Sequence, residues 1–263
     1  MFSGRNRILV KELVATDFKL RYQGSALGYA WSLLRPLFLF AILYVVFVGF
    51  LKIGGDIPHY PIYLLLGVMM WTFFSDLTAQ SLGSIVGRGD LIRKISIPRW
   101  IIVFSSSVMA LINLGLNLIV LAVFMVVNGV PLQLDILLLP LLILELYIFG
   151  LGLALFLSAA FVKFRDLGYV WEIVIQAGFY LTPVLYPLSI IKDVTLQKLI
   201  LLNPVAQVIQ DSRAVVVSQD TITTWKVFDG GPYVFIPIII VIVFTAIGVI
   251  YFRSQQNSFA ENL

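Results

Sequence analysis

The chain has 263 residues, of which 60% are hydrophobic and 12% are charged, and its mean hydropathy is +1.00. A soluble domain is nearer half apolar and a quarter charged, so this composition excludes one aqueous domain and indicates an integral membrane protein. The formal net charge is +4, and the absence of cysteine excludes disulfides, thiolate metal sites and cysteine nucleophiles.

The apolar segments predict an all-α membrane fold, because a helix needs about 20 mostly apolar residues to cross the hydrocarbon core. Six segments qualify as transmembrane helices: 29–51, 60–82, 100–127, 136–161, 170–187 and 232–252. We expect one membrane domain, 1–263. Its parts are an arm (1–28), spans one to five (29–187), an external loop with re-entrant helices (188–231), and span six with a tail (232–263).

Lysine and arginine are distributed unevenly among these segments, and such a bias sets the orientation of a membrane protein. The basic residues on the predicted cytoplasmic side are Arg5, Arg7, Lys11, Lys19, Arg21, Arg88, Arg93, Lys94, Arg99, Lys163, Arg165 and Arg253. The predicted outside holds Lys52 and four residues of the long loop. Both termini are therefore expected in the cytoplasm. Because the basic residues lie at span ends, we expect no nucleic-acid partner.

The N-terminal arm has apolar residues at helical spacing, with basic residues distributed around them. This pattern is typical of an amphipathic helix on an anionic membrane surface. The spaced positions are Leu9, Leu13, Thr16 and Leu20. Two glycine pairs have the four-residue spacing that lets helix backbones approach closely: Gly24 with Gly28, and Gly83 with Gly87.

The segment GSIVGRGDLIRKISIPRW connects spans two and three. Asp90 is a candidate N-cap, residues 91–96 can form about two helical turns, and Pro98 would stop them. So short a helix is not stable by itself. Its residues therefore favour docking on another surface, and a basic turn that follows the positive-inside bias is an equal alternative.

Catalytic machinery is scarce in this sequence. The one histidine, His59 in IPHYP, cannot make a two-histidine metal site, and a loop histidine beside prolines is more often plain surface. We predict neither a catalytic nor a metal site. The phosphate-binding pattern GxxxxGK[ST] is also missing, because no glycine directly precedes a lysine. If the protein uses nucleotide energy, another chain must supply the ATPase.

Three acidic residues fall within predicted spans, where a carboxylate is costly unless it is paired, hydrated or protonated. They are Asp76, Glu145 and Glu172. Asp76 and Glu172 are near enough to the cytoplasmic ends to reach headgroup water, whereas Glu145 is the deepest. Its role stays open between function, such as a proton relay, and a hydrogen bond between helices.

Several motifs occur together in a recognisable order. They are DFKLRYQGSALGYAWSLLRPL, WTFFSDLTAQSLGSIVGRGDLIRKISIPRW, FRDLGYVWEIVIQAGFYLTPVLYPLS and LILLNPVAQVIQDSR. Over nearly the whole chain they resemble the permease subunit of ABC-2 type exporters for polysaccharides, O-antigen and teichoic acids. The resemblance implies a bacterial or archaeal cytoplasmic-membrane subunit that forms a homodimer and pairs with two ATPase subunits. It implies a transport subunit, not an enzyme, with MgATP bound in the partner and no cofactor here.

The resemblance assigns the cytoplasmic segments as well. The segment 90–97 is similar to a coupling helix that rests in a cleft of the ATPase, which favours docking over a basic turn. The coupling residues would be Asp90, Leu91, Ile92, Arg93, Lys94 and Ile95. The arm is similar to a gate helix beside the entrance for a lipid-linked glycan. Because guanidinium groups grip phosphate oxygens with several donors, a polyprenyl pyrophosphate would contact Arg5, Arg7, Lys11, Arg21, Tyr22 and Arg35.

The resemblance also assigns part of the external end, whereas the channel candidates follow from the chemistry of a glycan. The segment around Asn203 and Pro204 resembles paired helices that cap the channel, and Thr182 with Pro183 would bend span five at a gate. A sliding glycan needs flat aromatic surfaces and few fixed hydrogen bonds. Candidates are Phe38, Phe40, Tyr44, Trp71, Phe73, Phe74, Phe179, Tyr180 and Tyr186. For each of them, lipid-facing packing or an interfacial aromatic belt is the alternative.

The leading hypothesis is the membrane subunit of an ATP-driven exporter for a polyprenyl-linked polysaccharide or teichoic acid. An ABC-2 permease for a small lipid or drug is one rival, although it would not need so basic an arm. A membrane transferase acting on the same lipid carrier is a second rival, and the lone histidine argues against it. A proton-coupled flippase that uses Glu145 is a third.

Overall fold

The computed structural model describes residues 4–22, 28–50, 57–94, 97–131 and 133–259, and every regular element in these ranges is helical. Four segments in them are long and apolar enough to cross a membrane. They are Tyr60–Leu82 (α3), Trp100–Val127 (α5), Leu134–Lys163 (η4, Leu134–Leu138, with α6, Leu139–Lys163) and Pro232–Ser258 (η6, Pro232–Phe235; α11, Ile236–Gln255; η7, Gln256–Ser258). Predicted spans two, three, four and six fall on these segments, so the all-helical membrane fold is confirmed.

The first and fifth predicted spans correspond to shorter apolar helices. The helix α2 (Trp31–Tyr44) continues as a π-helix, η2 (Val45–Phe50), and its apolar part is Pro36–Phe50. The helix α7 covers only Leu167–Leu181, so residues 182–187 of the predicted span are not helical. Thr182 is extended, with φ −86° and ψ 141°, because a residue before proline is disfavoured in the helical region. Pro183 therefore follows the end of the helix and does not bend it.

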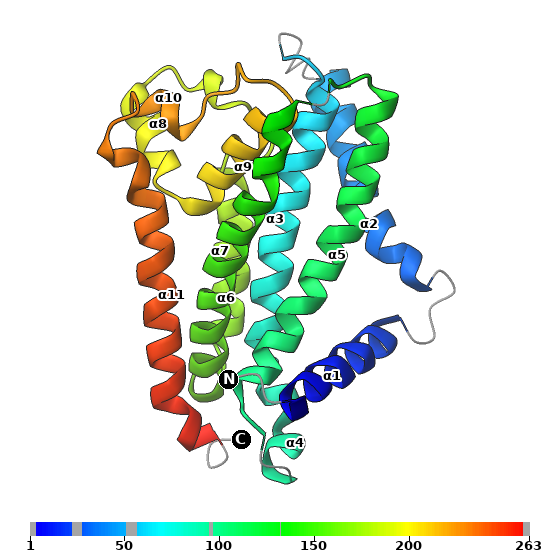
Figure 1. Ribbon diagram of the computed structural model, residues 1–263, viewed down its shortest axis with the longest axis vertical. Coiled ribbons are helices and arrows are strands. Elements are labelled where there is room, and N and C mark those ends of the chain that lie inside the picture. The colour runs from blue at the N-terminus through cyan, green and yellow to red at the C-terminus, as the bar shows by residue number, and fades with distance from the viewer. Residues whose placement is uncertain (1–3, 23–27, 51–56, 95–96, 132, 260–263) are drawn as a thin grey trace.

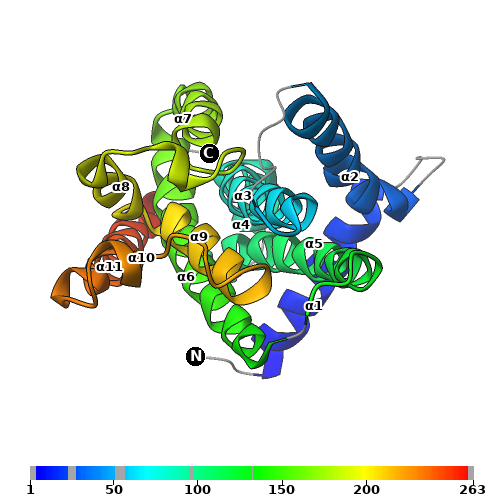
Figure 2. The ribbon, with the colours of Figure 1, turned by 90° about the horizontal axis from the view of Figure 1, so that it is seen from above.

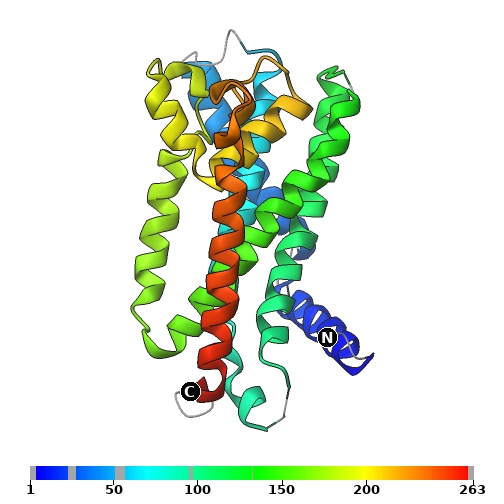
Figure 3. The ribbon, with the colours of Figure 1, turned by 60° about the vertical axis from the view of Figure 1, so that its left-hand side comes forward.

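The long helices form a bundle around α3. The helices α2, α3, α5, α6, α7 and α11 run along the long axis of the molecule (Figures 1 and 3). α3 packs against α5, α6 and α7, and α11 lies along α6. Seen from above, α2 and α7 lie on either side of α3 (Figure 2). Most of α3 is buried, as expected of a largely apolar helix at the centre of a bundle.

Shorter helices gather at the two ends of the bundle (Figure 1). What we name the α4 end holds α1 (Gly4–Tyr22), the 3-10 helix η3 (Val86–Arg88), α4 (Gly89–Lys94) and the last residues of α11. What we name the α9 end holds the 3-10 helix η5 (Leu188–Ile190), α8 (Val194–Leu201), α9 (Pro204–Val216) and α10 (Thr224–Val227). The first and last described helices thus lie at the same end of the molecule.

The predicted loop 188–231 folds into capped helices. The carboxylate of Asp193 accepts a hydrogen bond from the amide of Thr195 at 2.8 Å, and this contact begins α8. Asn203 caps α9 in the same way, accepting from Val205 at 3.0 Å, and Pro204 occupies the first turn, where its missing N–H costs nothing. α9 is mostly buried and packs against α3, α6 and α11. This segment therefore packs into the bundle as part of the fold.

The arm forms the helix α1, which packs against α5. Its half-buried apolar residues are Leu9, Val10, Leu13, Val14 and Phe18. The opposite, exposed face carries Arg7, Lys11 and Lys19, together with Thr16, which the spacing had placed on the apolar face. The apolar stripe thus packs partly on the protein, and the basic residues lie outward.

Close backbone approach occurs at glycines other than the predicted ones. A Cβ added to Gly83 or Gly87 would meet no heavy atom within 4 Å, so the prediction for this pair is wrong, and Gly24 lies outside the described residues. In contrast, a Cβ on Gly248 of α11 would lie 2.0 Å from the carbonyl oxygen of Gly152 in α6. The absent side chains let these two helices touch backbone to backbone.

Candidate functional site

A cavity of about 510 Å³ lies between α2, α3 and α7, and it unites three of the predicted channel aromatics. Its lining residues are Pro36, Leu39, Trp71, Thr72, Ser75, Asp76, Ile175, Gln176, Phe179 and Tyr180. Helical spacing explains the lining, because positions 72, 75 and 76 share one face of α3, and positions 176, 179 and 180 share one face of α7. The cavity thus combines aromatic rings with hydroxyl, amide and carboxylate groups.

The aromatic part of this cavity is built by close packing of α3 on α7. The rings of Trp71 and Phe179 meet edge to face with centroids 6.1 Å apart, and Phe179 meets Tyr180 at 5.4 Å. Gly178 makes room for the indole, because a Cβ there would lie 2.7 Å from Cη2 of Trp71. Tyr180 is 64% exposed, so its ring is accessible from outside the chain.

The remaining predicted aromatics are not lining residues of this cavity. Three are buried in the core: Phe40, Phe73 and Phe74. Two are exposed on α2: Phe38 and Tyr44. Tyr186 is half-buried beyond α7, where its hydroxyl donates to the Leu181 carbonyl at 3.3 Å. Sequence reasoning could not separate these groups, because an aromatic ring suits a core, a membrane interface and a cavity wall alike.

The predicted coupling segment forms α4, but its residues face different ways. Ile92 is buried in this chain, Leu91 is half-buried, and Asp90, Arg93 and Lys94 are exposed. The helix begins at Gly89, so Asp90 lies in the first turn and is not the N-cap that the sequence predicted. Ile95 lies outside the described residues. Ile92 holds α4 to the bundle, and the polar residues form its outer face.

The predicted phosphate contacts lie on or near α1. Arg7 and Lys11 are exposed one helical turn apart, on the face of α1 that points away from α5. The side chains of Arg5, Arg21, Tyr22 and Arg35 lie outside the part of the chain that the structure describes. The described residues therefore give this end of the molecule an outward basic row.

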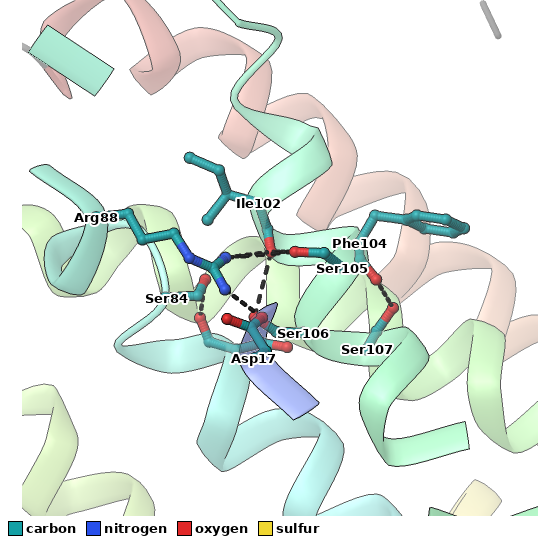
Figure 4. A network of polar contacts seen from close by, with 9 residues as sticks. Asp17, Ser84, Arg88, Ile102, Phe104, Ser105, Ser106 and Ser107 are labelled. Carbon is teal, nitrogen blue, oxygen red and sulfur yellow. Dashed lines mark hydrogen bonds and ion pairs between the residues drawn. The ribbon is translucent and has the colours of Figure 1, made fainter. Parts of the chain in front are cut away.

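A polar network beside α4 was not anticipated from the sequence (Figure 4). The guanidinium of Arg88 donates to the carboxylate of Asp17 in α1. It also donates to the carbonyl of Ile102 and to Oγ of Ser105, both in α5, at 3.3 Å. Arg88 had been interpreted only as part of the positive-inside bias. The run of serines at 105–107 within an apolar span was the available signal.

At the α9 end, a buried arginine joins segments that are far apart in the sequence. Arg213 is fully buried, and its guanidinium donates to the carbonyls of Tyr63 at 3.0 Å, Pro183 at 2.5 Å and Val184 at 2.6 Å. Its guanidinium carbon also lies 3.7 Å from the centroid of the Tyr63 ring. No sequence pattern indicated this role, because Arg213 looked like one of several loop charges.

The predicted external-gate residues lie at the same end of the molecule. The amide of Asn203 donates to Oγ1 of Thr182 at 3.5 Å, which connects the start of α9 to the end of α7. Thr182 is buried and Asn203 is exposed. Pro183 contributes the carbonyl that Arg213 contacts, and Pro204 is buried in the first turn of α9. All four predicted residues thus lie where the chain after α7 meets α9.

Glu145 contacts the same end of the molecule from α6. The amide nitrogen of Gln207 in α9 lies 3.5 Å from a carboxylate oxygen of Glu145 and donates to Asp211 at 2.8 Å. Asp211 also accepts a hydrogen bond from the amide of Thr224 at 3.3 Å. Burial raises the pKa of the Asp211 carboxyl, and these hydrogen bonds oppose the rise. The contact of Glu145 supports the helix-to-helix alternative for this residue.

Comparison with known proteins adds an independent line of evidence. A family model described as "ABC-2 type transporter" matches residues 8–217. An O-antigen export system permease protein RfbA from Myxococcus xanthus is 30% identical over 258 residues, which covers 98% of this chain and 96% of the relative. A protein of the same description from Klebsiella pneumoniae is 31% identical over 253 residues, covering 94% and 92%. A second Klebsiella pneumoniae protein is 30% identical over 252 residues, with the same coverage.

Proposed function

Since the chain belongs to the ABC-2 type transporter family, we propose that it is the permease subunit of a polysaccharide exporter. The substrate would be a polyprenyl-pyrophosphate-linked polymer, such as an O-antigen or a teichoic acid, that crosses a bacterial or archaeal cytoplasmic membrane. Its similarity to O-antigen export permeases over nearly its whole length supports a polysaccharide as the exported polymer.

The observation that carries the proposal is the cavity between α2, α3 and α7. A sugar ring has a weakly apolar face and a rim of hydroxyl groups. Aromatic rings offer the face a flat surface, and short polar side chains offer the rim exchangeable hydrogen bonds. The flat surface is provided by Trp71, Phe179 and Tyr180. The hydrogen bonds are provided by Thr72, Ser75 and Gln176. A glycan can therefore lie in this cavity and still slide along it.

The cytoplasmic side of the proposal rests on α1 and α4. We place the α4 end in the cytoplasm, where the predicted basic segments lie. The pyrophosphate of the lipid carrier would contact Arg7 and Lys11, together with Arg5, Arg21, Tyr22 and Arg35. The outer face of α4 would dock on a separate ATPase subunit that binds MgATP. Two copies of this chain would pair with two copies of that subunit.

The α9 end would be the outer gate. The contact between Thr182 and Asn203 and the three carbonyls bound by Arg213 hold α9 across the bundle. Movement of the segment after α7 against α9 would then open or close the outer end of the path. The proposal thus assigns one end to entry and energy input and the other to exit.

Tyr180 provides a test of the glycan path that does not disturb the fold. Its ring is exposed and lines the cavity, so Tyr180→Ala should slow export of the polysaccharide about tenfold, as expected when about 1.4 kcal/mol of stacking is lost. Tyr180→Phe keeps the ring and should retain most activity. The measurement is the rate of polysaccharide display on cells, with the amount of permease in the membrane determined alongside.

The control for this test is Tyr169→Ala on the same helix. Tyr169 is 74% exposed and is not a lining residue of the cavity, so this variant should export normally. Equal export by the two alanine variants would contradict the proposed path.

Leu91 provides a test of the ATPase contact. Leu91→Asp places a charge on the half-buried apolar part of α4 and should abolish both stable association with the ATPase subunit and export. Co-purification of the two subunits from membranes is the measurement. The same substitution at Leu134, 85% exposed at the opposite end, is the control and should leave association intact. Association of the Leu91→Asp variant at the wild-type level would show that α4 is not the docking surface.

A further inference from the structure

Arg88 holds together three elements at the α4 end of the molecule. It is the last residue of η3 and directly precedes Gly89, the first residue of α4. Its guanidinium contacts Asp17 of α1 and two groups of α5, and Figure 4 shows these contacts converging on one side chain. Because Arg88 is joined directly to α4, a movement of α4 must displace either the guanidinium or the groups that it contacts.

The contact between Arg88 and Asp17 is partly buried. Their side chains are 19% and 25% exposed, and Ser105, the α5 partner, is fully buried. A charge-assisted hydrogen bond in such surroundings is stronger than one at an open surface. The pair can therefore stay together while the elements around it move.

Open space lies beside the segment that carries Arg88. A cavity of about 310 Å³ lies beside the pair, lined by Asp17, Gln80, Gly83, Ser84, Gly87, Arg88, Ser106 and Met109. Gly83 and Gly87 have no heavy atom within 4 Å of where a Cβ would be. The turn between α3 and α4 is thus open at its two glycines, is anchored in the core by the buried Ile85, and is joined to α1 through the arginine side chain.

We infer that Arg88 is a positioning residue that transmits movement of α4 to α1 through Asp17. This inference rests on the proposed function, because it takes α4 as the ATPase contact and α1 as the helix beside the substrate entrance. When the ATPase displaces α4, Arg88 pulls Asp17 and the basic face of α1 moves with it. Ile102 and Ser105 of α5 provide the fixed point against which the guanidinium turns. ATP hydrolysis and substrate entry are then joined by one ion pair.

A charge swap tests this inference. Asp17→Arg and Arg88→Asp are made singly and together, and each permease is purified with its ATPase subunit and reconstituted. Each single variant should still assemble and hydrolyse ATP, but the polysaccharide exported per ATP should fall about tenfold, within the range typical of coupling between sites. The double variant restores opposite charges and should recover part of this ratio, because the carboxylate of Arg88→Asp cannot donate to the Ile102 carbonyl of α5. Glu12→Lys, a charge reversal on the exposed face of α1, is the control and should match the wild type.

Two outcomes would overturn the inference. One is a wild-type export-to-ATP ratio in both single variants. The other is a double variant no better than the single ones, since that would assign the loss to each side chain separately and not to the pair. If the wild-type chain does not assemble with the ATPase subunit, the proposed function fails first, and the inference fails with it.

Discussion

Replacing Arg213 by methionine should strongly lower the thermal stability of the protein. Methionine keeps much of the length of the side chain but none of its donors. The carbonyl of Tyr63 keeps its bond within the helix α3, but the carbonyls of Pro183 and Val184 would then be buried without this partner. Each stranded polar group costs about 1–3 kcal/mol, so the folded state should lose about 2 kcal/mol or more.

Thermal unfolding of purified protein in detergent measures this loss. Arg213→Lys keeps the charge but cannot contact three carbonyls with a planar fork, so its melting temperature should fall between those of the wild type and Arg213→Met. Arg253→Met removes an exposed arginine from the last turn of α11 and should change the melting temperature little. If Arg213→Met melts at the same temperature as Arg253→Met, the three carbonyl contacts do not stabilise the fold.

A substitution at Gly67 offers a second test of the contacts made by Arg213. A Cβ at this position would lie 2.3 Å from Nη2 of Arg213 and 2.9 Å from the carbonyl oxygen of Val184. Gly67→Ala should therefore displace the guanidinium and destabilise the protein without changing any charge. Because Arg213 joins α3, the segment after α7, and α9, both variants act on the position of α9. Loss of this arginine should thus affect the proposed outer gate as well as stability.

The helices that could be predicted from the sequence are those with uninterrupted apolar runs. α3 and α5 have the predicted bounds, 60–82 and 100–127, because loops with proline or glycine flank both runs. The fifth span was predicted to end six residues too late and to start three residues too late, since 182–187 is apolar enough to look like membrane helix. Hydropathy measures transfer of side chains into lipid, whereas Pro183 acts on the backbone of the residue before it.

The candidate site was predictable in kind but not in detail. The nine candidate rings were chosen from glycan chemistry, and three of them, Trp71, Phe179 and Tyr180, line one cavity. The contacts made by Arg88 and Arg213 were not predicted. Their partners are Asp17, 71 positions away, and the Tyr63 carbonyl, 150 positions away. A backbone carbonyl has no signature in a sequence, so a charge that depends on one looks like a charge in a loop.

A second large loss of stability is expected from substitutions at the contact between α6 and α11. Gly248→Ala would place a Cβ 2.0 Å from the carbonyl oxygen of Gly152 and 3.3 Å from its Cα. These neighbours are backbone atoms of a long helix, so they cannot turn aside as a flexible side chain could. The two helices must separate along their contact, and overpacking of this kind costs about 1–3 kcal/mol or more.

Alanine substitutions at three glycines test this packing through thermal unfolding. Gly152→Ala should resemble Gly248→Ala, because its Cβ would lie 2.5 Å from Cα of Thr245 on the facing helix. The double variant should cost less than the sum of the two, since helices already forced apart admit the second methyl group more easily. Gly115→Ala is the control: no heavy atom lies within 4 Å of its Cβ position in α5, and alanine favours a helix over glycine by about 1 kcal/mol. A melting temperature for Gly248→Ala at or above that of Gly115→Ala would mean that α6 and α11 are not in backbone contact.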